Sequence, residues 1–180
     1  MRLTVAPLLL LLFLLLSFSG TLLAGQGQYK TREQLLEIAF PSVTGKPIPY
    51  KMETLWLTKE IKQTAENILG HPLNILRVRY WKHANRSVWI LDEIGKIKPI
   101  TTGVIIENAN IHSLHILAFR ESRGWEVKYP FFTDQFLNAA LNQKSRLDKN
   151  IDGITGATLS VRAVTNVARL ALYFHTQTDL

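Results

Sequence analysis

The stretch between residues 75 and 120 constrains the fold more than any other part of this sequence. It holds four segments rich in valine, isoleucine and aromatic residues, a composition typical of β-strands. The segments span residues 75–81, 87–94, 97–107 and 111–120, and only short polar or glycine-containing joints separate them. Because such joints are too short for a crossover helix, we expect consecutive strands to pair antiparallel in a meander.

Two helices are expected before these strands. Thr31 is followed three residues later by Gln34, which is capping-box spacing for a short helix that ends before Pro41. A second helix is expected over residues 58–69, with one apolar face and with Gly70 at its C-terminal end. Residues 41–49 contain three prolines and a glycine, which favours a loop between them.

Two more helices are expected after the strands. One begins near Thr133, and its apolar residues are Phe136, Leu137, Ala140 and Leu141. The other covers residues 161–174, with small and apolar side chains on one side and Arg, Thr and Asn on the other. This order of elements predicts a single-domain α+β fold, in which helices pack against one face of an antiparallel sheet.

Composition excludes several classes of function. The 180 residues contain no cysteine, which rules out disulfides, thiolate metal sites and a cysteine nucleophile. The formal charge is +7, but the 21 basic residues are scattered and never form a run of five. We therefore predict no nucleic-acid partner, and we explain the basic side chains around Arg77 and Arg79 as a charged strand face.

Residues 1–24 have the pattern of an export signal. Arg2 gives a positive start, residues 8–16 are an unbroken apolar run, and small residues lead to Ala24. Cleavage after Ala24 is one outcome. The alternative is an uncleaved anchor, because residues 3–24 are about long enough to cross a bilayer. Both outcomes predict that residues 25–180 lie outside the cytoplasm, in the periplasm or at the outer face of the cytoplasmic membrane.

A turn of small residues precedes the last helix. It contains Asp152, Thr155, Gly156, Ala157, Thr158 and Ser160. The exposed N–H groups and positive dipole of a helix N-terminus favour an anion, and the small side chains leave space for a phosphate. The alternative is that Thr155, Thr158 or Ser160 simply caps the helix.

The string Asp-x-x-Thr-Gly-Ala-Thr at residues 152–158 resembles the flavinylation motif of the FMN-binding domain family. That family includes one subunit of the sodium-pumping NADH:quinone oxidoreductase and the matching subunit of the Rnf complex. In the family, a flavin transferase joins FMN through its phosphate to the last threonine of the motif. The resemblance therefore implies a phosphoester on Thr158, with Asp152, Thr155, Gly156, Ala157 and Ser160 around the cofactor.

The resemblance extends upstream to about residue 95. Glu121, Ser122 and Gly124 resemble the family's Glu-Ser/Thr-x-Gly loop, which lies against the isoalloxazine ring. Glu121 and Ser122 are candidates to hydrogen-bond the ring or ribityl chain, and the alternative for them is an ordinary strand-end turn. Trp125 is a candidate to stack on the ring, and its alternative is a half-buried place in the core. Arg123 replaces the proline of the redox-pump subunits, which favours a stand-alone relative. We divide the exported chain into residues 25–94, a helical and first-strand region, and residues 95–180, an FMN-binding-like region.

These observations predict an extracytoplasmic electron carrier with covalent FMN. Its expected partners are a flavin transferase and a membrane-bound or periplasmic redox protein, and residues 3–24 are a candidate membrane anchor. No nucleophile, acid–base pair or set of metal ligands is evident, so we expect a carrier rather than an independent enzyme. The alternative function is a secreted binding or sensory domain of the same fold without flavin. Because a transferase must reach it, the Thr158 hydroxyl is expected to be solvent-accessible.

Overall fold

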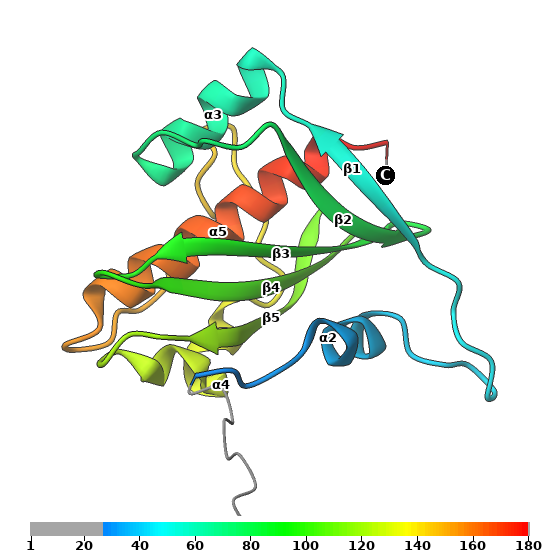
Figure 1. The fold of residues 1–180 in the computed structure, drawn as a ribbon, viewed down its shortest axis with the longest axis horizontal. Coiled ribbons are helices and arrows are strands. Elements are labelled where there is room, and N and C mark those ends of the chain that lie inside the picture. Colours follow the sequence, from blue (N-terminus) through cyan, green and yellow to red (C-terminus); the bar gives the residue numbers. More distant parts are fainter. Residues whose placement is uncertain (1–26, 180) are drawn as a thin grey trace, which may run out of the picture.

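The computed structural model describes residues 27–179, so the predicted export segment at residues 1–24 lies outside the described residues. Five strands form one antiparallel sheet in the order β1-β2-β3-β4-β5 (Figure 1). Their bounds are β1 Lys51–Trp56, β2 Arg77–His83, β3 Arg86–Ile94, β4 Pro99–Glu107 and β5 Asn110–Phe119. The four predicted strands and their meander pairing are confirmed, as is the α+β fold class.

Strand β1 was not predicted from the sequence. It pairs with β2 from Lys51↔Lys82 to Trp56↔Arg77 and forms one edge of the sheet. Only Leu55 is buried in it, so the alternation of apolar and polar residues that marks a half-buried strand is missing. Pairing with β2 rather than burial of its side chains defines this strand.

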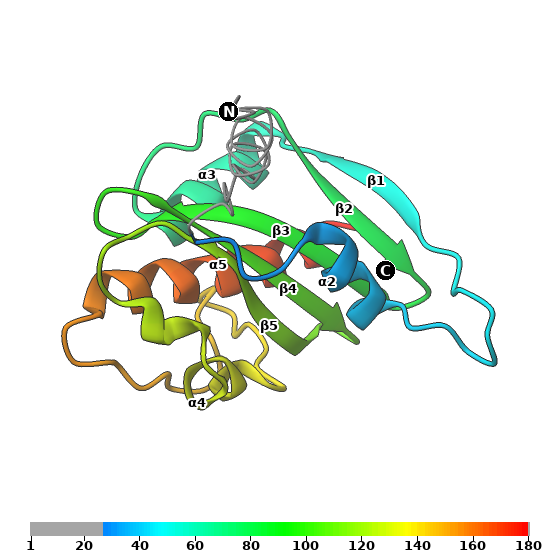
Figure 2. The same cartoon turned by 60° about the horizontal axis from the view of Figure 1, so that its bottom comes forward.

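Helices cover both faces of the sheet, not one as predicted (Figures 1 and 2). Helices α3 (Lys59–Leu69) and α5 (Thr158–Thr176) pack on one face, where α5 contacts β3, β4 and β5. Helix α2 (Arg32–Ala39) lies on the other face, against Val88, Ile105 and Leu117. Its short apolar stripe matches the side chains that β3, β4 and β5 turn away from α5, which is why a second, smaller core forms there.

The predicted capping box of the first helix and the predicted C-cap Gly70 of the second are confirmed. Thr31 and Gln34 form a reciprocal capping box at the start of α2. Thr58 accepts a hydrogen bond from the Ile61 amide at the start of α3, and Gly70 ends that helix in the left-handed conformation. Each side-chain cap is worth about 1 kcal/mol, so local sequence fixes where these helices begin.

The prediction of a helix that starts at Thr133 is wrong. The chain forms three short pieces instead, η1 Trp125–Lys128, α4 Pro130–Thr133 and η2 Asp134–Phe136. Leu137 leaves helical geometry and Asn138 has a φ of 59°. The Asn138 amide donates a hydrogen bond to the Ile111 carbonyl on β5, and the Ala139 carbonyl accepts one from the Ile111 amide. Ala140 and Leu141 are therefore in irregular chain. The hydrogen bonds with β5 take the place of a further helical turn.

The expected division of the chain lies between residues 94 and 95. Strands from both sides of it belong to one sheet. Strand β3 pairs with β4 along its whole length, from Arg86↔Glu107 to Ile94↔Pro99. The division falls in the hairpin turn between them. Within residues 27–179, no helix combines the length and apolar character needed to cross a membrane, and no cluster of ligating side chains is suited to a metal ion.

Candidate functional site

The N-terminus of α5 and the loop that follows β5 meet at one cavity. Its volume is about 600 Å³. It is lined by Lys96, Glu121, Ser122, Arg123, Gly156, Ala157, Thr158, Leu159 and Ser160. The structure thus brings the predicted residues Glu121 and Ser122, which lie more than thirty positions earlier in the chain, to the Gly-Ala-Thr turn.

Gly124 allows the two segments to approach this closely. It has a φ of 86°, and a Cβ atom built on it would lie 2.5 Å from Oγ of Ser160 and 3.3 Å from Cβ of Ala157. Ala157 and Ser160 are both buried against this loop. Only glycine combines the left-handed backbone with the absence of a side chain, so these three residues hold the shape of the cavity.

The hypothesis that a threonine or serine caps α5 is wrong. The N-cap residue is Ala157, and no side chain makes a cap hydrogen bond. The first amide to donate into the helix is that of Val161, which bonds to the carbonyl of Ala157. Among residues 27–179, no acceptor is found for the amides of Thr158, Leu159 and Ser160. The helix therefore presents uncapped N–H groups and the positive end of its dipole to the cavity.

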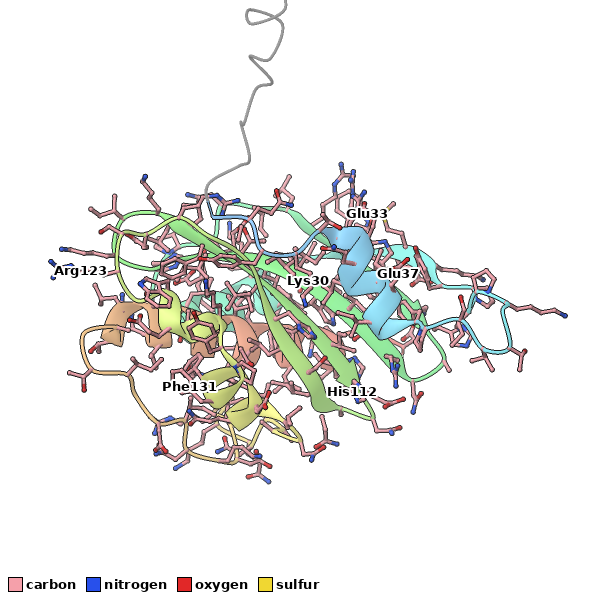
Figure 3. All side chains as sticks on the ribbon, turned by 90° about the horizontal axis from the view of Figure 1, so that it is seen from below. Lys30, Glu33, Glu37, His112, Arg123 and Phe131 are labelled. Atoms are coloured by element: carbon pink, nitrogen blue, oxygen red, sulfur yellow. The ribbon has the colours of Figure 1, made fainter. Side chains whose placement is uncertain are left out.

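Space and access are present where the motif predicts a bound phosphate. Thr158 is exposed, as expected for a residue that a modifying enzyme must reach. Gly156 has a φ of 80°, and no atom lies within 4 Å of the position that its Cβ would occupy. Lys96 and Arg123 add two exposed positive side chains, and Arg123 projects from the molecule near the start of α5 (Figure 3). The electrostatics and the open space both favour an anion here.

Glu121 has a structural role that was not predicted from the sequence. Its Oε1 accepts hydrogen bonds from the amides of Lys96, Ile97 and Lys98, at 2.6, 2.5 and 2.8 Å. Partial burial disfavours ionisation of this carboxyl, but the three amides and the charge of Lys98 outweigh it, so the pKa of Glu121 lies below its usual value. The carboxylate fixes the β3–β4 turn beside the cavity, which leaves Oε2 as the atom to test for contact with a cofactor.

A second cavity, of about 940 Å³, shares Glu121 and Ser122 with the first. Its other lining residues are Gly27, Tyr29, Ile97, Lys98, Phe119, Arg120 and Trp125. Trp125 is 42% exposed and meets Tyr129 edge to face, with 5.6 Å between ring centroids. The structure therefore places Trp125 in this aromatic cavity and Thr158 in the other, with Ser122 between them.

Asp152 and Thr155 line neither cavity. Both are exposed, and the amide of Asp152 donates a 2.6 Å hydrogen bond to Oε1 of Gln135. Their position is suited to shaping the turn that leads into Thr158.

Sequence reasoning missed Lys96 and Tyr29. Lys96 belongs to a hairpin turn, Gly-Lys-Ile-Lys, whose two lysines are a weak signal for an anion site. Tyr29 reaches the second cavity because residues 28–30 run beside β5, with a bridge from Gln28 to Ala118 and a hydrogen bond from the Tyr29 amide to the Leu117 carbonyl. No local pattern predicts that pairing.

The chain was compared with models of known families. The family described as the FMN-binding domain matches residues 95–173, which confirms the resemblance inferred from the motif. The match contains every lining residue of the first cavity, whereas Gly27 and Tyr29 of the second lie outside it. No curated protein matches the chain.

Proposed function

Because residues 95–173 match the FMN-binding domain family, we propose that this protein is an extracytoplasmic electron carrier whose FMN is joined through its phosphate to Oγ1 of Thr158. The observation that carries the proposal is the placement of Thr158. It is the exposed first residue of an uncapped helix, in a cavity that also holds Lys96 and Arg123. The donor set fits a phosphate, since amides, a helix dipole and two cations all favour negative charge.

The attachment step is a phosphoryl transfer. The Oγ1 atom of Thr158 attacks the FMN-side phosphorus of a flavin dinucleotide, which the transferase supplies. An Oγ1–P bond forms, the diphosphate P–O bond breaks, and a nucleoside monophosphate leaves. The hydroxyl proton passes to a base of the transferase, and no electrons are gained or lost. The exposure of Thr158 supports this role because the hydroxyl must enter the active site of another protein.

The remaining residues of the site orient the flavin. When bound, FMN supplies reversible electron transfer, and the protein supplies position and electrostatics. Ser122 and Glu121 line both cavities, where their side chains are suited to bond the ribityl chain or the ring edge. Trp125 and Tyr29 offer aromatic surface for the ring in the second cavity.

Location and partners follow from the export pattern of residues 1–24. A carrier outside the cytoplasm cannot be reloaded with a lost cofactor, and a covalent bond removes that risk. We propose a flavin transferase as its modifying partner and a membrane-bound or periplasmic redox protein as its electron partner. Residues 3–24 either are removed or anchor the domain to the membrane.

The test is to express the full chain with a flavin transferase and to examine the denatured product. We expect flavin absorbance to remain with the unfolded protein, and the intact mass to rise by one FMN less one water. Thr158→Ala abolishes both signals, and Thr158→Ser, which keeps a hydroxyl, restores them at least in part. Thr44→Ala, at an exposed hydroxyl outside the motif, is the matched control and stays loaded.

Two outcomes overturn the proposal. One is covalent flavin retained in Thr158→Ala, which would place the attachment elsewhere. The other is a colourless wild-type protein of unmodified mass made beside an active transferase, which would favour a binding or sensory domain without flavin.

A further inference from the structure

The sheet opens between β2 and β3. These strands pair only from Tyr80↔Trp89 to His83↔Arg86. Beyond Tyr80, back to Arg77, β2 is paired only with β1. Beyond Trp89, on to Ile94, β3 is paired only with β4, so β2 and β3 diverge (Figure 1). Each therefore has a paired strand on one side only along the opening.

A groove of about 670 Å³ occupies this opening, on a different part of the molecule from the flavin site. Its floor is apolar and comes from Leu69 of α3 and from Leu170 and Phe174 of α5. Val78 and Leu91 form its buried walls. A volume of this size is in the range of small-molecule sites, and such sites are typically apolar with a few polar groups.

The mouth of the groove exposes apolar surface. Ile75 and Ile94 line it and are 41% and 46% exposed. Exposed apolar side chains beside an apolar groove are a common mark of a binding surface, because a ligand would remove both from water.

The charges at the mouth are unevenly paired. Side chains alternate along β2, so Arg77 and Arg79 are exposed on the face opposite the buried Val78 and Tyr80. Within residues 27–179, neither arginine has a carboxylate partner, and Arg77 only lies over the Trp56 ring at 5.4 Å.

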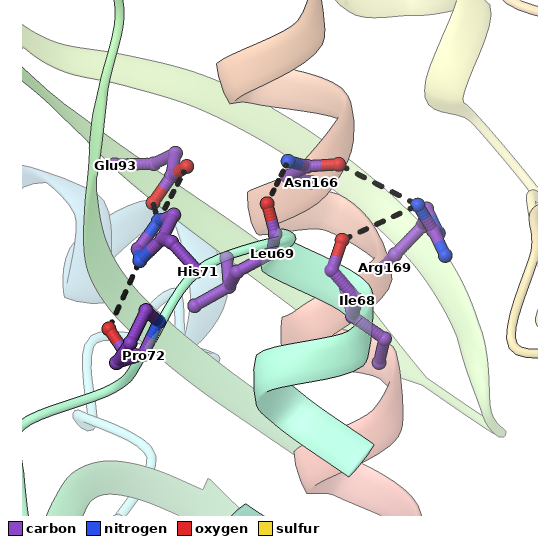
Figure 4. Close-up of polar contacts among 7 residues, drawn as sticks. All are labelled: Ile68, Leu69, His71, Pro72, Glu93, Asn166 and Arg169. Atoms are coloured by element: carbon purple, nitrogen blue, oxygen red, sulfur yellow. Dashed lines mark hydrogen bonds and ion pairs between the residues drawn. The ribbon is translucent and has the colours of Figure 1, made fainter. Parts of the chain in front are cut away.

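Arg32 and Glu93 also line the groove and have ionisable partners, whereas Asp92 has no cationic partner within residues 27–179. Arg32 binds Glu33 at 2.6 Å, and the Asp92 carboxylate accepts a 2.5 Å hydrogen bond from Thr101. Glu93, which is buried, lies 3.0 Å from Nε2 of His71 (Figure 4). The groove thus has two arginines without a carboxylate partner against one carboxylate without a cationic partner, Asp92, so the excess charge is positive.

We propose that this groove binds an anionic amphiphile, a molecule with a flexible apolar chain and a carboxylate or phosphate head. The chain lies on the floor against Leu170 and Phe174, and the head contacts Arg77 and Arg79 at the mouth. An uncharged chain would leave the arginines unpaired. The inference is independent of flavin attachment, because it uses none of the residues that line the flavin cavities.

The experiment is calorimetric titration of the full chain with decanoate below its critical micelle concentration. We expect one decanoate to bind per chain and to raise the unfolding temperature. The double variant Arg77→Gln and Arg79→Gln weakens binding at least tenfold, whereas Lys46→Gln and Lys144→Gln, at exposed positions elsewhere, leave it unchanged. Asp92→Asn removes a nearby negative charge and strengthens binding a few-fold. The uncharged 1-decanol binds at least tenfold more weakly than decanoate.

A second experiment shows whether the bound amphiphile is a free molecule or a membrane lipid. Co-flotation with phosphatidylglycerol vesicles, absent with phosphatidylcholine and lost in the double arginine variant, assigns the head group to a lipid surface. Decanoate binding without flotation assigns it to a free acyl anion. The proposal is overturned if neither probe binds, or if binding is unchanged in a double variant whose unfolding midpoint matches the wild type.

Discussion

Gly124 lies directly against Ser160, so the loop after β5 and the first turn of α5 are held together by a contact that has no room for a methyl group. We predict that Gly124→Ala destabilises the protein by about 2 kcal/mol or more. About 1 kcal/mol of this comes from the left-handed backbone, and the rest comes from displacing Ser160. Urea denaturation measures the change.

The matched control for this substitution is Gly45→Ala. Gly45 has a φ of 77°, but no atom lies within 4 Å of its Cβ position. It should show the backbone strain alone, about 1 kcal/mol. Equal losses of stability in the two variants would contradict the contact between Gly124 and Ser160.

Glu121→Gln tests the turn between β3 and β4. The substitution replaces an ionised acceptor of three amides with a neutral one, and we expect a loss of about 1 to 3 kcal/mol in the free energy of unfolding. The loss should shrink in acid. The pKa of Glu121 is lower in the folded state, so its contribution is present above the unfolded pKa and disappears as pH falls through the folded value.

Chemical denaturation at pH 7 and at pH 3 measures both effects. Glu37→Gln, at an exposed position on α2 (Figure 3), serves as the control and should change stability little at either pH. A Glu121→Gln variant as stable as Glu37→Gln at pH 7 would show that the turn does not depend on this carboxylate.

Variants of Lys96 and Arg123 test the proposed anion site without changing Thr158, the proposed attachment residue. Changing both to glutamine removes two positive charges from the cavity around Thr158. We expect covalent flavin loading to slow about tenfold, which corresponds to about 1.4 kcal/mol of lost interaction with phosphate. Absorbance of the denatured protein at timed intervals measures the rate.

The control for this pair is Lys46→Gln, whose residue lies in the loop before β1. Raising the salt concentration should slow the wild type and reduce its advantage over the double variant, because salt screens exposed charges. Loading that is equally fast in the double variant would remove these two residues from the site.

His115 gives the protein a pH-dependent stability. Burial, followed by the charge of Lys30, lowers the pKa of His115 to about 4. The unfolded chain binds a proton near pH 6.5 and the folded chain does not, so stability should fall as pH drops from about 6.5 to 4. The expected contribution is on the order of 3 kcal/mol.

His115→Gln should flatten this part of the stability profile. His112→Gln, at an exposed neighbour on the same strand, should leave it in place. Thermal unfolding of the three proteins across that pH interval checks the prediction, and parallel curves for wild type and His115→Gln would contradict it.

Local signals were sufficient for much of the fold. The capping residues Thr31, Thr58 and Gly70 and the apolar stripe of α5 each act within a few residues, and those elements form where the sequence predicts them. The helix expected at Thr133 failed because its backbone bonds to Ile111 on β5, a partner more than twenty residues away. Strand β1 was not predicted because its pairing with β2, and not the burial of its side chains, defines it.

For the candidate site too, some residues could be predicted from local sequence and others could not. The motif at residues 152–158 and the loop at Glu121 and Ser122 are contiguous strings, so a family resemblance could predict them as site residues, and the structure brings Glu121, Ser122 and Thr158 to one cavity. The cap hypothesis for α5 was wrong because the helix begins at Thr158 itself, with Ala157 before it. Lys96 joins the site only through the hydrogen bonds that Glu121 makes across the fold.

The segment that runs beside the end of β5 brings Gly27 to the wall of the aromatic cavity. Ala24 is three positions before Gly27, a span of at most about 11 Å. A retained anchor would therefore hold this cavity close to the lipid, and the proposed flavin could then exchange electrons only with proteins embedded there. Removal of the leader would release a diffusible shuttle, free to collide with partners at a distance from the bilayer.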